Sequence, residues 1–305
     1  MTAARFGLLS YPGIANLGDP IQSLAARRFL PQVDVLIERE RISAPPGGSA
    51  APVKAILNGW FMHAPENWPP HPAIVPLPVS MHFVEPGVSR LRRWAVNPLD
   101  RMLSGAGAEY LRHWGPVGAR DRYTLDELHK RDVPAYLSGC LTLTLRRPER
   151  PRGEVIVASD LSPAALARLR AASSRPIVAV THLGGERLDH DQQHSAALGL
   201  LETYAGAAAV VTTRIHAAMP CLALGTPVLL LHDGQPKRRV RDVTELVHAC
   251  SEADFLRGRL DYDWAEPPAN PDAFRALIPA LEHACRDFTG FDQAAIGQSF
   301  PSASR

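Results

Sequence analysis

The segment Ala207–Leu231, AAAVVTTRIHAAMPCLALGTPVLLL, decides the fold class. Its pattern predicts a buried strand over 208–213, a helix over 215–224 and, after a Gly-Thr-Pro turn, a second buried strand over 228–232. Strands that are apolar on both faces and alternate with helices are typical of parallel sheets. The segment therefore predicts an α/β fold in which a strand gives way directly to a helix.

Two polar side chains, Arg214 and His216, interrupt this apolar run at the predicted junction of strand and helix. Burying an unpaired cation is costly, so a guanidinium at this point indicates a partner. Ligands of open α/β sheets bind beyond the carboxyl ends of strands, where helix N-termini favour anions. We predict that Arg214, with Thr213 beside it, binds an anion and that His216 transfers a proton. The alternative is an Arg214 paired within the core and a structural His216.

The geometry of the junction sets a condition on this hypothesis. Residues i and i+2 lie about 200° apart on a helix, so Arg214 and His216 can face one ligand only if the helix begins at or after Ile215. His216 would then occupy the first helical turn, where the helix dipole lowers the pKa of an imidazole. Bound phosphate and carboxylate groups would raise that pKa again. We therefore expect His216 to take up a proton when an anionic ligand binds.

A second motif, Asn16–Asp19 (NLGD), opens a predicted helix over 20–30. An aspartate followed by proline is typical of an N-cap, which predicts that Asp19 caps this helix. Gly18 is expected to supply a positive φ to the loop, and Asn16 to shape it. The alternative to a purely capping role is that Asp19 acts as a general base.

Other polar residues also lie at the ends of predicted strands and helices. His82 ends a strand within 77–83, Arg120 and Asp121 precede a helix, and a basic turn opens a helix over 238–250. We predict that the substrate-binding residues include His82, Arg120, Asp121, Lys237 and Arg238. The alternatives are a structural Arg120–Asp121 ion pair and a solvated basic turn.

Metal and disulfide chemistry are not expected. His190 and His194 are spaced i, i+4, as in some zinc sites, and His182 precedes them. The chain has no H-E-x-x-H pattern and no evident third ligand, so we predict no metal site. Its four cysteines are widely spaced without a C-x-x-C pair, which predicts reduced thiols.

Length and composition predict a globular protein. The chain has 305 residues, of which 46% are hydrophobic and 21% charged, with a net charge of +2. Nothing in this charge marks a nucleic-acid-binding protein, and no apolar run is long enough to span a membrane. No signal peptide is recognised, so we expect a cytoplasmic protein, in solution or peripheral at the inner face of the membrane.

The domain limits are predicted from one linker-like segment, Arg146–Gly153, which is charged and proline-rich. We expect an N-terminal α/β domain over 1–148, a C-terminal α/β domain over 149–290 and a flexible tail over 291–305. Regular strand–helix alternation after residue 153 predicts a parallel sheet with helices on both faces. A last helix is expected over 271–287, crossing back to the first domain.

Several blocks of the sequence resemble motifs of the polysaccharide pyruvyl transferase family, in the family's order. The segment Thr212–Val228 is similar to its T-[ST]-R-x-H-A motif followed by G-x-P-V. The other similar blocks are Asn16–Asp19, Asn58–Phe61, Ser80–Phe83, Gly118–Thr124 and Ser138–Leu143. The resemblance implies two Rossmann-like domains, arranged like those of GT-B glycosyltransferases.

The resemblance also implies transfer of a pyruvyl group from phosphoenolpyruvate to a sugar, as a ketal. The enol carbon is protonated, a sugar hydroxyl attacks the oxocarbenium-like centre, phosphate leaves, and a second hydroxyl closes the ring. This chemistry needs an acid, a base and cations for one carboxylate and one phosphate. We expect His216 to be the acid, Asp19 the base on the acceptor side, and Arg214 the donor ligand, with the two motifs facing each other across an inter-domain cleft.

Two other functions fit the same sequence. A GT-B glycosyltransferase would use a nucleotide-sugar donor, with Asp233 binding the ribose. A binding or regulatory protein would have kept the fold and lost the chemistry, although Arg214 and His216 are both present. No cofactor and no nucleic-acid partner are expected. The acceptor saccharide, lipid-linked or free, and the oligomeric state stay open.

Overall fold

The computed structural model describes residues 4–83, 97–149, 151–234 and 238–293. Contacts along the chain divide it into two compact units. The first contains Met1–Tyr11, Ala25–Leu141 and Ala280–Gln293, and the second contains Pro12–Leu24 and Thr142–Pro279. The domain limits expected from the sequence, at 148/149 and 290/291, stay predictions about independently folding parts.

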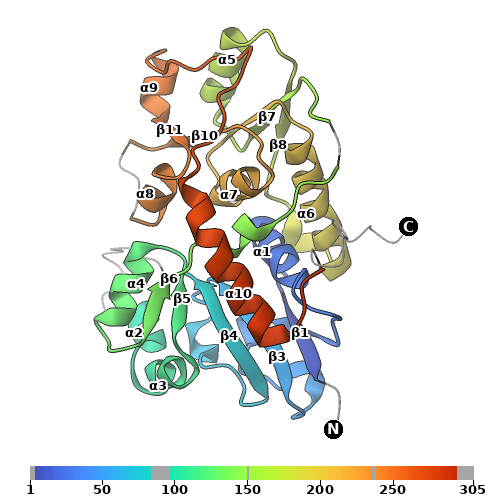
Figure 1. Cartoon of the computed structure of the whole chain (residues 1–305), viewed down its shortest axis with the longest axis vertical. Helices are drawn as coiled ribbons and strands as arrows, with labels where there is room; N and C mark the ends of the chain where they lie inside the picture. The colour runs from blue at the N-terminus through green and yellow to red at the C-terminus, as the bar shows by residue number, and fades with distance from the viewer. Residues whose placement is uncertain (1–3, 84–96, 150, 235–237, 294–305) are drawn as a thin grey trace. The chain divides into compact units, whose positions relative to one another are not determined.

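The first unit is built on six parallel strands in the order β2-β1-β3-β4-β5-β6 (Figure 1). The strands are β1 (Arg5–Ser10), β2 (Val35–Glu38), β3 (Val53–Gly59), β4 (Ile74–Met81), β5 (Val117–Ala119) and β6 (Ala135–Leu137). The helices whose residues contribute to this unit are α1 (Gly18–Arg27), α2 (Pro98–Met102), α3 (Gly105–Trp114), α4 (Arg122–His129) and α10 (Ile278–Thr289). The strand order reverses at β1, as in doubly wound sheets.

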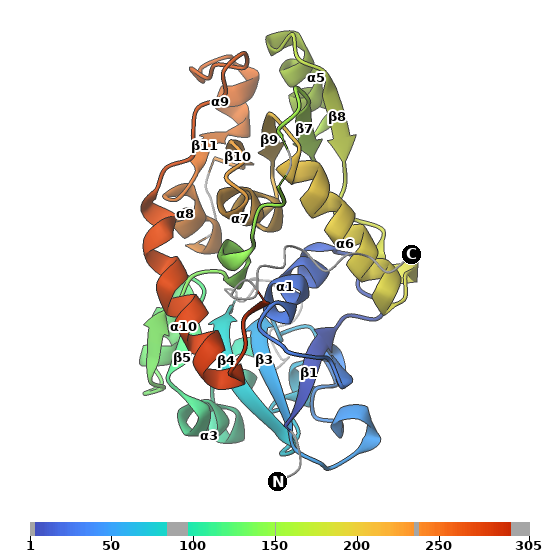
Figure 2. The ribbon, with the colours of Figure 1, turned by 45° about the vertical axis from the view of Figure 1, so that its right-hand side comes forward.

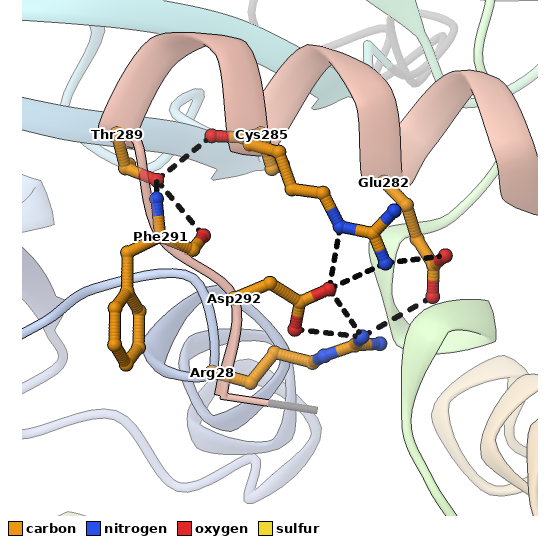
Figure 3. Close-up of polar contacts among 7 residues, drawn as sticks. Arg28, Glu282, Cys285, Thr289, Phe291 and Asp292 are labelled. Carbon is orange, nitrogen blue, oxygen red and sulfur yellow. Dashed lines mark hydrogen bonds and ion pairs between the residues drawn. The ribbon is translucent and has the colours of Figure 1, made fainter. Parts of the chain in front are cut away.

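The last helix, α10, returns to this N-terminal sheet, as predicted. Figures 1 and 2 show it lying across the strands, and Lys54 of β3 donates a hydrogen bond to the Phe288 carbonyl at 2.8 Å. Figure 3 shows the ion pairs that hold α10 and the residues after it. Arg28 donates to both oxygens of Asp292, at 3.0 and 3.1 Å, and to Glu282 at 3.2 Å. Arg286 donates to the same two carboxylates, so the end of the described chain is tied to the unit that contains its start.

The second unit is built on five parallel strands in the order β11-β10-β9-β7-β8. The strands are β7 (Ile156–Ser159), β8 (Ile177–Val180), β9 (Ala209–Thr212), β10 (Val228–His232) and β11 (His248–Ser251). The helices are α5 (Pro163–Ala172), α6 (His190–Ala205), α7 (Ile215–Ala223), α8 (Arg238–Thr244) and α9 (Glu252–Leu256), and residues 18–24 of α1 also belong to this unit. All strands run parallel, so the predicted α/β class with parallel sheets is confirmed in both units.

Helices cover both faces of the second sheet. Alternate strand residues such as Ile156 and Val211 pack with Leu169 of α5 and Phe255 of α9 in one apolar cluster. On the opposite face, the hydroxyl of Ser159 meets the hydroxyl of Tyr204 on α6 at 3.0 Å. Side chains of a strand alternate between faces, so the two layers belong to one doubly covered sheet.

One element of this unit was predicted wrongly. The helix expected over 238–250 ends at Thr244, and residues 248–251 form the edge strand β11. A short apolar run of this kind fits a helix or a strand, and pairing with β10 decides the outcome. Among the described residues, no helix has both the length and the apolar character needed to cross a bilayer.

Candidate functional site

The site of the second unit lies where its strand order reverses. Strand β7 pairs with β8 on one side and with β9 on the other, so the loops that leave β7 and β9 diverge. Asp160 directly follows β7, and Thr213 and Arg214 directly follow β9. Ligands of open α/β sheets bind at such a switch point. The sequence predicted Thr213 and Arg214 here but missed Asp160.

Asp160 holds Arg214 by an ion pair. The Nε of Arg214 donates to Oδ2 of Asp160 at 2.9 Å. The hydroxyl of Thr181 donates to Oδ1 at 2.6 Å, and the backbone N–H of His182 donates to Oδ2 at 3.0 Å. Burial opposes ionisation, but these hydrogen bonds and the charge of Arg214 outweigh it and lower the pKa of the Asp160 carboxyl.

Arg214 lies at the N-terminus of α7 and remains accessible. It has extended backbone angles, φ −102° and ψ 127°, and the helix begins at Ile215. The condition for Arg214 and His216 to face one ligand is therefore met. The Arg214 side chain is 34% exposed. A partly exposed guanidinium beside a helix N-terminus suits an anion.

The N-terminal motif is seated on the same unit. The Leu17 N–H donates to the His182 carbonyl at 2.7 Å, and the Gly185 N–H donates to the Ala15 carbonyl at 2.9 Å. A Cβ built on Gly18 would lie 2.8 Å from Nδ1 of His216. The two motifs therefore touch within one compact unit, whereas the sequence analysis expected them to face each other from separate domains.

Two details of this motif correct the sequence analysis. Helix α1 begins at Gly18, so Asp19 lies in its first turn and is not the N-cap. Gly18 has no positive φ; within the motif, glycine is required by the close approach of His216. Asn16 shapes the loop as predicted, because its Oδ1 accepts the Gly18 N–H at 3.2 Å. Asp19 is buried and accepts a hydrogen bond from Gln22 Nε2 at 3.2 Å.

Three other predicted residues meet in the first unit, after β4 and β5. The Nδ1 of His82 lies 2.6 Å from Oδ2 of Asp121, and Nε of Arg120 lies 3.7 Å from the same oxygen. Asp121 also caps α4 by accepting the Thr124 N–H at 2.9 Å. Burial alone would raise the pKa of Asp121, but the His82 hydrogen bond, the charges of His82 and Arg120, and the Thr124 N–H lower it to about 2. Asp121 is therefore an ionised anchor for its two neighbours.

The remaining predicted residues fall into two groups. Arg238 begins α8, whereas Lys237 lies outside the described residues. The rings of His190 and His194 are 4.1 Å apart on α6, but no group of three or more metal-ligating residues is found in the described part of the chain. The four cysteines are free thiols.

A buried row of hydrogen-bonded side chains, His182, Tyr204 and Ser159, supports the site. The sequence did not predict it. The Tyr204 hydroxyl lies 2.6 Å from Nε2 of His182 and 3.0 Å from Oγ of Ser159. Burial lowers the pKa of His182 to about 4, so its imidazole is neutral. His182 thereby anchors a backbone that bonds Asp160 through its N–H and Leu17 through its carbonyl. Asp160 could have been found from its place directly after a buried strand, but no local signal marks Tyr204.

Comparisons with known proteins identify a family for this chain. The family model described as polysaccharide pyruvyl transferase matches residues 16–231. No curated protein matches. A solved structure of an uncharacterized protein from Klebsiella pneumoniae subsp. pneumoniae NTUH-K2044 is 12% identical, with a TM-score of 0.42 over 75% of this chain and 83% of that chain. CalG4, the calicheamicin glycosyltransferase, is 13% identical, with a TM-score of 0.33 over 97% of each chain.

The two structural likenesses are too distant to carry an argument about function, whereas the family match covers most of the chain. It begins at Asn16, includes the Arg214–His216 motif and ends at residue 231, within β10. It thus contains both motifs that the fold brings into contact. This chain is a transferase that belongs to the polysaccharide pyruvyl transferase family.

Proposed function

We propose that the chain transfers a pyruvyl group from phosphoenolpyruvate to a saccharide of a polysaccharide or its precursor, forming a ketal. The observation that carries the proposal is the partly exposed Arg214, held by Asp160 at the N-terminus of α7, with His216 in the first turn. Phosphoenolpyruvate offers a carboxylate and a phosphate, which a guanidinium binds bidentately. Arg214 and Thr213 would hold the donor.

In the proposed reaction, His216 donates a proton to the methylene carbon of the donor. A sugar hydroxyl attacks the cationic C2 and gives its proton to Asp19. The bond between C2 and the phosphate oxygen then breaks, and phosphate leaves with the electron pair. A second hydroxyl adds to C2 and gives its proton to the released phosphate, and the proton on Asp19 returns to His216 through solvent, so one donor and one diol give one ketal and one hydrogen phosphate. General acid catalysis contributes about 10²–10⁴-fold to such a step.

The proposal assigns the other predicted residues to the two substrates. Asn16 and Gly18 shape the loop next to the acid, His82, Arg120 and Asp121 serve the acceptor side, and Lys237 and Arg238 serve the donor phosphate. It also includes an acceptor that is made in the cytoplasm, lipid-linked or free. No cofactor takes part in these steps.

The first experiment separates the donors. Phosphoenolpyruvate and UDP-sugars are offered separately while thermal unfolding is followed. A ligand at 100 times its dissociation constant stabilises by about 2.7 kcal/mol, so we expect a clear rise in melting temperature with phosphoenolpyruvate. Stabilisation by UDP-sugars alone would instead indicate a nucleotide-sugar glycosyltransferase, and no response to either would favour a binding protein.

The second experiment tests turnover and Arg214. Phosphate release from phosphoenolpyruvate is screened with free and lipid-linked saccharides. With the best acceptor, Arg214→Lys keeps the charge but loses the planar fork, so the KM for the donor is expected to rise about tenfold or more. Arg275→Lys, at an exposed arginine of the same unit, is the matched control and should leave KM unchanged. Unchanged kinetics with a lower melting temperature in Arg214→Lys would show a structural arginine.

A further inference from the structure

We propose that Asp160 is a positioning residue that fixes the Arg214 guanidinium by its Nε edge and presents the outer edge to the donor anion. The inference deepens the proposed function and rests on it for the identity of the ligand. Nothing in the sequence motifs that resemble the family includes Asp160. The pairing of β7 with β9 brings Asp160 next to Arg214.

The ion pair with Asp160 engages only the Nε edge of Arg214. Nε of Arg214 donates to Oδ2 of Asp160 at 2.9 Å. Within the described residues, the two terminal nitrogens of Arg214 donate no hydrogen bond. An arginine held at Nε keeps both terminal nitrogens for a second partner, in the geometry that suits a carboxylate or phosphate. Asp160 therefore occupies one edge of the Arg214 guanidinium, and the other edge can bind a ligand.

Asp160 is itself held in place by hydrogen bonds to its carboxylate. Its carboxylate accepts from Thr181 and from the His182 N–H as well as from Arg214, and its side chain is 10% exposed. Its φ is +53°, a left-handed conformation that aspartate and asparagine adopt more readily than most residues. These contacts hold the Asp160 carboxylate in place, so it can fix the position of the Arg214 guanidinium.

Asp160 also holds Thr213. The Thr213 hydroxyl donates to the Asp160 carbonyl at 3.0 Å. One residue at the end of β7 thus orients both donor-side residues at the end of β9. A carboxylate that already accepts three hydrogen bonds is poorly suited to take a proton from a substrate, so Asp160 acts through Arg214 and Thr213.

These contacts predict a separation between binding and turnover. Replacing Asp160 by Asn removes a negative charge near the donor, which favours anion binding, and loosens the guanidinium, which disfavours it. The two effects oppose each other in the Kd for phosphoenolpyruvate, which we expect to change less than about threefold. Misplacement of a substrate by about 1 Å can cost about 10²-fold in rate, so kcat is expected to fall about tenfold or more.

The closing experiment combines NMR with a double-mutant cycle. Protein labelled with ¹⁵N at arginine Nε gives one resonance that disappears in Arg214→Lys, and this assigns Arg214. We expect that resonance to shift, and its proton to exchange faster, in Asp160→Asn, which tolerates the same backbone angle. With the best acceptor, Asp160→Asn should lower kcat in the wild-type background but by less than twofold in Arg214→Lys. Asp189→Asn, at the N-cap of α6, is the matched control for charge and should change neither readout.

Each outcome decides the inference. An Arg214 resonance that is unchanged in Asp160→Asn overturns it, and so does an equal loss of kcat in both backgrounds. A lower melting temperature with unchanged kcat would show that Asp160 is only structural. If phosphoenolpyruvate neither binds nor turns over in the wild type, the proposed function fails, and the NMR comparison alone then decides whether Asp160 positions Arg214.

Discussion

Gly18 leaves no room for a side chain beside the imidazole of His216: a Cβ at this position would lie 2.8 Å from Nδ1 and 3.0 Å from Cβ of His216. The contact joins the N-terminal motif to the first turn of α7. Because the second distance is to Cβ, rotation of the imidazole alone does not relieve it. The absence of a side chain at Gly18 therefore allows His216, the proposed acid, to occupy its position.

The first prediction is that Gly18→Ala displaces His216. We expect kcat for phosphate release to fall about tenfold or more, because a misplaced acid loses its alignment with the reacting carbon. Gly199→Ala is the matched control: it lies within α6, and nothing stands within 4 Å of its Cβ. Alanine stabilises a helix interior by about 1 kcal/mol over glycine, so this control should keep its activity and melt slightly higher. Normal turnover in Gly18→Ala would show that His216 has room to move.

The fold could largely be predicted because its determinants are local. The apolar strand 209–212 and the helix 215–223 follow from periodicity, and the break at Arg214 follows from the cost of burying a cation. The edge strand β11 could not be predicted, because its pairing with β10 is a tertiary contact.

The residues of the candidate site could be predicted only where a local sequence pattern marks them, and not where a tertiary contact brings them in. Arg214 and His216 can be recognised in the sequence because they interrupt an apolar run. Asp160 lies 54 residues before Arg214, and only the pairing of β7 with β9 brings the two together. Gly18 was expected to have a positive φ, which it does not have; the need for glycine there comes from the approach of His216. A positive φ is a local property, whereas the approach of His216 depends on how the N-terminal loop is seated.

The second prediction concerns pH and His182. Burial places the folded pKa of His182 at about 4, below its ordinary value of 6.5. Between these values the unfolded state binds more protons than the folded state, so stability is lost as the pH falls from about 6.5 towards 4. The loss amounts to about 2 kcal/mol between pH 7 and pH 5.

Chemical unfolding at pH 7, 6 and 5 measures this contribution. His182→Gln removes the titrating group, so it should flatten the pH dependence by about that amount, even if it is less stable at pH 7. His283→Gln, at an exposed histidine of α10, is the control and should keep the wild-type slope. A wild-type slope in His182→Gln would show that another group is responsible.

The third prediction concerns the buried ion pairs of Figure 3. Asp292→Asn takes one carboxylate from Arg28 and from the partly exposed Arg286, which leaves the buried charge of Arg28 partly uncompensated. Breaking a buried pair costs about 3–5 kcal/mol, so we expect a fall of several degrees in melting temperature. Asp272→Asn breaks the exposed pair with Arg275 and is expected to cost less than about 1 kcal/mol. Equal melting temperatures for the two variants would mean that the buried pairs contribute no more than the exposed one.

The last prediction concerns His216. It lies in the first turn of α7, where the helix dipole disfavours an imidazolium until an anion binds beside it. We therefore expect phosphoenolpyruvate to bind with uptake of a proton near neutral pH, and His216→Gln to bind the donor within about tenfold of the wild-type affinity while losing turnover. Calorimetric titration of both proteins in two buffers of different ionisation enthalpy measures the proton. If the wild type takes up none, or the variant turns over normally, the acid lies elsewhere, and His82, 2.6 Å from Asp121, is the next residue to replace.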